Sequence, residues 1–132
     1  MKLRIRGNSI RLRLTQSEVS RFAEEGEIKA SIQFGPGNAL NYQLKMADCG
    51  DLQAQFDGSQ IAIMVPKDMG HQWATSDEVG MEHLVKIDQQ QSLKILIEKD
   101  FQCLTLRPGD EDSDTFPNPH SRHEVVESSK NQ

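Results

Sequence analysis

Cationic side chains crowd the beginning of this 132-residue chain. Lys2, Arg4, Arg6, Arg11 and Arg13 fall close together, and no acidic residue lies among them. Guanidinium groups hold phosphates and carboxylates through paired hydrogen bonds, so such a cluster has the chemistry of an anion site. The whole chain carries a net charge of −5. The local excess of positive charge therefore contrasts with the protein around it.

The spacing of these cations predicts a β-hairpin. Apolar and basic residues alternate on both sides of Gly7-Asn8, which suits a two-residue turn because glycine tolerates positive φ. This turn would place Arg4 opposite Arg11 and Lys2 opposite Arg13 on one face. Like charges directly opposite each other destabilise a strand pair by a few tenths of a kcal/mol to about 1 kcal/mol. We therefore expect another group to compensate the repulsion.

Three compensating groups are considered. The first is acidic residues from the tail or from neighbouring strands, such as Glu27, Glu82 and Glu98, which would leave an ordinary solvated surface. The second is an anionic phosphate or carboxylate ligand, or an acidic protein segment, held by these cations together with Lys29. The third is nucleic acid, which the sequence disfavours because the basic stretch has no aromatic residues for stacking and the protein is acidic.

Alternation of apolar and polar residues continues through the first hundred residues and predicts about eight strands. They cover residues 2–6, 10–14, 27–34, 40–46, 52–56, 60–65, 81–87 and 93–98. Asp57-Gly58 predicts a second tight hairpin. A capping box at Thr15 and Glu18 predicts a helix that ends near Gly26, and a shorter helix is predicted around residues 67–73. We expect an α+β fold, mostly antiparallel β, with the strands in one curved sheet or closed barrel.

A single sheet would bring many polar side chains onto the face that carries the cations. This face would hold few acids and many neutral hydrogen-bonding groups, which is typical of a polar barrel lumen and also of an ordinary solvated sheet. Its further members would be Lys29, Ser31, Gln33, Asn41, Gln43, Lys45, Gln53, Gln55, Gln60, Lys86 and Lys94.

The composition changes near residue 107. Residues 1–106 should form one β-rich domain, because a chain of this length buries a sizeable core without disulfides. Residues 107–132 are acidic, contain prolines and have few large apolar residues, so we expect this tail to be largely mobile.

Cys49 and Cys103 form no disulfide framework and are expected to be reduced thiols. Charges interrupt the apolar runs, so we expect a cytoplasmic protein without a signal peptide or membrane contact.

Two stretches of the chain are distinctive: MKLRIRGNSIRLRLTQSEV at its start and EKDFQCLTLRPGDEDSDTFPNP near its end. Together they resemble a small family of uncharacterised bacterial proteins, a domain of unknown function. The resemblance spans the chain and implies no activity, cofactor or site residue.

The expected architecture is similar to that of the triphosphate-tunnel enzymes, which hold a polyphosphate inside an eight-stranded barrel. Those enzymes begin with a Glu-x-Glu-x-Lys strand whose carboxylates bind a metal ion. Here the matching strand, residues 2–6, carries bases where the acids belong. Glu98, Asp100 and Glu82 are the carboxylates that a metal-dependent phosphohydrolase would use, and this enzyme class is kept as the alternative function.

Other chemical signatures are weak. Cys103, His120 and His123 match no recognised metal-finger spacing, and the acids of residues 110–114 lack the glycine and closing glutamate of a calcium loop. His83 alternates with apolar neighbours and is expected to be a partly buried structural histidine. We therefore predict a binding domain rather than an enzyme, with no catalytic residues, metal or cofactor. Its predicted anion site consists of Lys2, Arg4, Arg6, Arg11, Arg13 and Lys29.

Overall fold

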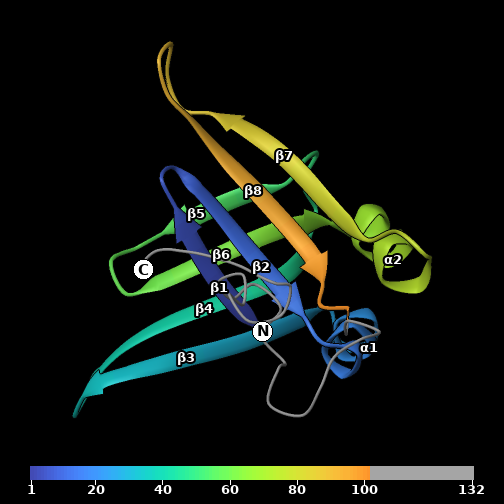
Figure 1. Ribbon diagram of the computed structural model, residues 1–132, viewed down its shortest axis with the longest axis horizontal. Coiled ribbons are helices and arrows are strands. Elements are labelled where there is room, and N and C mark those ends of the chain that lie inside the picture. Colours follow the sequence, from blue (N-terminus) through green and yellow to red (C-terminus); the bar gives the residue numbers. More distant parts are fainter. Residues whose placement is uncertain (102–132) are drawn as a thin grey trace, which may run out of the picture. The chain divides into compact units, whose positions relative to one another are not determined.

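The computed structural model describes residues 1–101, which contain eight strands and two helices (Figure 1). The predicted α+β class, with strands dominating, is confirmed. The predicted tail of residues 107–132, with His120, His123 and the acids of 110–114, lies outside the described residues, and so does Cys103. In chain order the elements are β1 (Lys2–Arg6), β2 (Ser9–Leu14), α1 (Gln16–Glu25), β3 (Glu27–Gly35), β4 (Asn38–Ala47), β5 (Gln53–Phe56), β6 (Gln60–Pro66), α2 (Lys67–Thr75), β7 (Gly80–Lys86) and β8 (Ser92–Lys99).

The strands are divided between two four-stranded sheets. Sheet 1 has the order β1-β2-β8-β7, and sheet 2 has the order β3-β4-β6-β5. Neighbouring strands run antiparallel, except that β2 is parallel to β8 and β4 is parallel to β6. The prediction of one curved sheet or a closed barrel is therefore wrong for residues 1–101. The physical reason is that α1 and α2 each carry the chain from one sheet to the other.

The first hairpin has the predicted register. Arg4 lies opposite Arg11 and Lys2 lies opposite Arg13, and Gly7 has a φ of 56° in the turn. The hairpin of β5 and β6 is also confirmed, but its turn lies one residue later than predicted. Gly58 has a φ of 96°, and the N–H of Asp57 donates to the carbonyl of Gln60 over 3.2 Å.

The two sheets are built alike from two halves of the chain. The order β1-β2-α1-β3-β4 is followed by the equivalent order β5-β6-α2-β7-β8, and exchanging the halves converts the strand order of sheet 1 into that of sheet 2. The registers agree as well. A shift of 51 residues takes the pair Leu3–Leu12 onto the pair Ala54–Ile63. Residues 1–101 therefore have an internal pseudo-two-fold symmetry, which we did not predict from the sequence.

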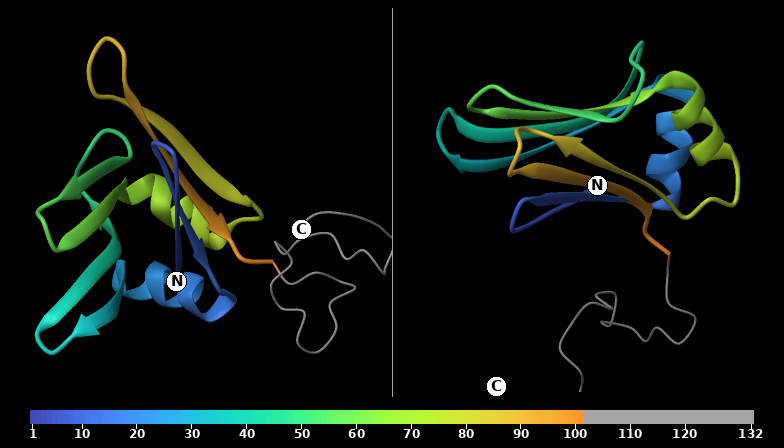
Figure 2. Two further views of the ribbon diagram at one scale, coloured as in Figure 1. Left: turned by 60° about the vertical axis from the view of Figure 1, so that its left-hand side comes forward. Right: turned by 90° about the horizontal axis from the view of Figure 1, so that it is seen from above.

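The core lies between the inner faces of the two sheets, and both helices close it at one end (Figure 2). Phe22 of α1 and Trp73 of α2 are fully buried there. Their ring centroids are 6.1 Å apart and their planes meet at 68°, an edge-to-face contact. The sheets contribute mainly the buried side chains of Leu12, Leu14, Ile28, Leu44, Ile63, Val65, Ile95 and Ile97.

Helix α1 begins with the predicted capping box. The backbone N–H of Glu18 donates to the hydroxyl of Thr15, and the Thr15 N–H donates to the Glu18 carboxylate over 2.9 Å. Glu18 also forms an ion pair with the N-terminal ammonium of Met1. Burial raises the pKa of Glu18, but this ammonium and the Thr15 hydrogen bonds outweigh the burial and lower the pKa below its ordinary value. The helix ends at Gly26, which has a φ of 81°.

Candidate functional site

The structure places five of the six predicted cations together. Lys2, Arg4, Arg6, Arg11 and Arg13 share the outer face of sheet 1, because they alternate with the residues that face the core. We call this outer face of β1, β2, β7 and β8 the basic face. Lys29 lies on the outer face of sheet 2 instead. The core separates the two outer faces, so Lys29 does not join the other five.

Acidic residues at the end of β8 lie against the paired cations. Glu98 is next to Arg13 in register. Its Oε1 is 3.5 Å from Nε of Arg11 and 3.9 Å from Nε of Arg13. Asp100 lies 3.7 Å from Nη2 of Arg13 and 3.3 Å from Nζ of Lys2. Acids from a neighbouring strand therefore compensate much of the repulsion inside the hairpin, as the first of the three alternatives supposed.

The basic face keeps a positive excess after this compensation. It also carries Lys86, Lys94 and Glu82, and Lys94 lies 3.5 Å from the Glu82 carboxylate. The face thus holds seven cations and three carboxylates, a net charge of +4. Residues 1–101 contain twelve cations and fourteen acids, so their net charge is −2. The rest of residues 1–101 therefore carries a net charge of −6. Positive and negative charge are thus strongly separated over the surface of the domain.

The carboxylates considered for a phosphohydrolase are already engaged by cations. Glu98 and Asp100 contact the arginines and Lys2, and Glu82 contacts Lys94. Within residues 1–101, no three His, Cys, Asp or Glu side chains come together as metal ligands. The two-sheet arrangement of these residues also encloses no barrel lumen for a polyphosphate. His83 is half-buried, with Nδ1 3.6 Å from an oxygen of Asp51, which fits the predicted structural role.

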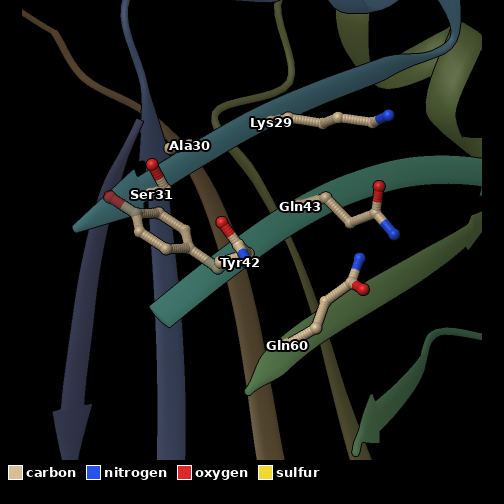
Figure 3. Close-up of a pocket in the computed structure, with 7 residues that line it drawn as sticks. Lys29, Ala30, Ser31, Tyr42, Gln43 and Gln60 are labelled. Carbon is tan, nitrogen blue, oxygen red and sulfur yellow. The ribbon is translucent and has the colours of Figure 1, made fainter. Parts of the chain in front are cut away.

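The outer face of sheet 2 has a different chemistry. Two adjoining cavities of about 330 and 600 Å³ lie on it and share Gln43 and Gln60. In Figure 3 the side chains of Lys29, Gln43 and Gln60 point to the same side of the sheet, whereas Tyr42 points to the opposite side. We call this pair of cavities the amide groove. Its polar lining consists of Lys29, Ser31, Asn41, Gln43, Lys45, Gln55, Asp57 and Gln60.

The sequence identified these polar residues but not the surface that they form. Alternation showed that Gln43, Gln55 and Gln60 point away from the core, and this is confirmed. The expected face joined them to Lys86 and Lys94, which the structure places on sheet 1. One feature of the sequence did distinguish this surface. In β6 the outer positions hold Ala62 and Met64, which interrupt the polar pattern seen on the outer faces of the other strands.

The fold and these surfaces define a two-sheet α+β domain with a net positive face on one sheet and an amide-lined groove on the other. This chain belongs to the family of unknown function DUF7009, which it matches over residues 1–120. The predicted membership in a domain of unknown function is therefore confirmed. No curated protein and no solved structure matches the chain. Neither helix of residues 1–101 is long and apolar enough to span a membrane.

Proposed function

We propose that this domain is a binding module whose basic face takes up an anionic partner that carries several phosphate or carboxylate groups. The observation that carries the proposal is the net charge of +4 on one face of a unit whose total charge is −2. A potential of this kind attracts anions and speeds their encounter with the surface.

The existing ion pairs leave these cations able to bind. The side chains of Arg11, Arg13 and Lys2 retain 32, 24 and 57% exposure, respectively. A guanidinium has five N–H donors, and one carboxylate engages at most two of them. Arg6 forms no ion pair with any residue in 1–101. An incoming anion can therefore bridge neighbouring guanidiniums without displacing Glu98.

The spread of the cations favours a multivalent partner over a single small anion. Lys2, Arg4 and Arg6 follow one another along β1, and side chains two positions apart on a strand are separated by about 7 Å. One phosphate reaches only part of such a surface. A chain of phosphates, or a segment with several carboxylates, matches its length.

The test is thermal stability in the presence of phosphate, pyrophosphate and triphosphate, with a poly-glutamate peptide as the carboxylate probe. We expect the stabilisation to grow with ligand charge and to weaken at high salt. At a hundred times its dissociation constant, a bound ligand stabilises the fold by about 2.7 kcal/mol. A larger shift with triphosphate identifies phosphate as the preferred group, and a larger shift with the peptide identifies carboxylate.

Two variants make this test specific. Arg4→Gln combined with Arg11→Gln removes two directly opposed cations and should abolish most of the response. Arg21→Gln is the matched control, because Arg21 is an exposed arginine on α1 outside the basic face. The absence of any anion response in the unmodified chain contradicts the proposal, and so does an equal response in the double variant.

A further inference from the structure

We propose that the amide groove on sheet 2 is a second, separate binding site, and that it takes a hydroxyl-rich ligand with a single carboxylate, as in a sugar acid. The groove crosses all four strands of sheet 2, from Lys29 on β3 to Gln55 on β5. Four strands at their usual spacing of about 4.8 Å span roughly 14 Å, which accommodates one or two sugar rings.

Gln43 is the residue that points to a ligand. It is 8% exposed although it lies on the outer face of its sheet. No described residue hydrogen-bonds to its side-chain amide, which points into the groove toward Gln60 (Figure 3). Its amide atoms are not among the fully buried atoms of residues 1–101, so the amide opens into the groove, where the protein uses neither its donors nor its acceptor. A ligand in the groove would supply the missing donors and acceptors.

The pseudo-symmetry shows that the backbone does not require amides at these positions. In sheet 1 the equivalent of Gln43 is Leu96, and the equivalent of Ala62 is Arg11. The same strand arrangement therefore accepts an apolar side chain where the groove has Gln43. Ala62, between Gln43 and Gln55 in register, has only a methyl group, and this small side chain opens the cavity.

The lining residues select the class of ligand. The amides of Asn41, Gln43, Gln55 and Gln60 each offer both a donor and an acceptor, which matches hydroxyl groups because these also donate and accept. Lys45 is half-buried at the groove and forms no ion pair with any residue in 1–101. It is therefore available to a carboxylate.

Two acids at or beside the groove limit the ligand to a single negative charge. Nζ of Lys29 lies 3.6 Å from the Glu27 carboxylate. The Asp57 carboxylate accepts the backbone N–H of Gln60 over 3.0 Å. A polyanion would meet both of these acids. Glu27 also lies directly opposite Lys45 in register, so Lys45 can balance no more than one ligand carboxylate.

The test uses glucuronate as the probe, with glucose and acetate as its two halves, and measures affinities of the full chain by calorimetry and amide chemical shifts. We expect glucuronate to bind most tightly, glucose more weakly, and acetate without saturation. The side-chain amide of Gln43 should shift on binding. Arg4→Gln with Arg11→Gln should leave this binding unchanged, which separates the groove from the basic face.

Gln43→Leu is the decisive variant. We expect glucuronate affinity to fall about tenfold, as the loss of one good hydrogen-bonded group implies, and the melting temperature to hold or rise. Gln53→Leu is the matched control, because Gln53 lies on the same face but lines neither cavity. Three results would overturn the proposal: no saturable glucuronate binding, equal affinity for acetate and glucuronate, or unchanged binding in Gln43→Leu.

Discussion

Arg11 on β2 and Ala62 on β6 occupy equivalent places in the two sheets. Arg11 lies opposite Arg4, and Ala62 lies opposite Gln55. The long cation in sheet 1 contributes to a positive surface, whereas the methyl group in sheet 2 leaves room for a cavity. One backbone arrangement thus presents two surfaces of different chemistry.

Ala62→Arg should close the amide groove without unfolding the domain. The equivalent position in sheet 1 already carries an arginine on the outer face, so the backbone tolerates this side chain. We expect the free energy of unfolding to change by less than about 1 kcal/mol, and glucuronate binding to be lost. Denaturant unfolding measures the change in stability, and titration calorimetry with glucuronate measures the binding. Retained binding in the folded variant would show that the ligand lies elsewhere.

Gly7→Val and Gly58→Val should each destabilise the domain by about 1–2 kcal/mol, because a β-branched residue resists positive φ. Nothing lies within 4 Å of a Cβ built at either glycine, so the effect is conformational rather than steric. Denaturant unfolding measures it. Gly7→Asn is the control and should cost clearly less, since asparagine enters this region more easily. Equal losses in Gly7→Asn and Gly7→Val would contradict the explanation.

Phe22 and Trp73 should show a favourable coupling energy in a double-mutant cycle. Edge-to-face aromatic pairs contribute about 0.5–1.5 kcal/mol beyond the apolar area that they bury. We expect Phe22→Leu and Trp73→Leu each to destabilise the fold, and the double variant to lose less than the sum of the two. Chemical denaturation of the four proteins gives the coupling. Strict additivity would show that the ring geometry contributes nothing.

Glu98→Gln should strengthen anion binding while it weakens the free protein. The substitution removes the carboxylate shared by Arg11 and Arg13 and raises the excess on the basic face from +4 to +5. We expect triphosphate to bind more tightly, and the unliganded domain to lose about 0.5–1 kcal/mol, because these pairs are partly exposed. Glu78→Gln removes an acid outside this face and should leave triphosphate affinity nearly unchanged.

The stabilisation that Glu18 provides should depend on pH. The lowered pKa of Glu18 in the folded state means that its contribution is complete above the pKa of the unfolded chain, about 4.3. This contribution is lost as the pH falls below that value. Glu18→Gln should therefore be less stable than the unmodified chain at pH 7, and the difference should shrink toward pH 3. A difference that stays constant over this range would exclude the ionised carboxylate as its source.

The local elements could be predicted because their causes lie within a few residues. The capping box of Thr15 and Glu18 marks the start of α1 through hydrogen bonds that span three positions. The register of β1 and β2 follows from Gly7-Asn8, because a two-residue turn determines which residues lie opposite each other. The opposed pair Arg4 and Arg11 was therefore visible in the sequence.

The composition of each sheet was decided only by the tertiary structure. Alternation shows which side chains of a strand point inward, but every strand here carries much the same alternation, so the pattern does not name its neighbour. The parallel pairing of β2 with β8 joins residues 85 positions apart in the chain, and it depends on how the inner faces pack around Phe22 and Trp73. That packing assigns Lys29 and Arg11 to different sheets, because α1 carries the chain from the hairpin of β1 and β2 in sheet 1 to the hairpin of β3 and β4 in sheet 2.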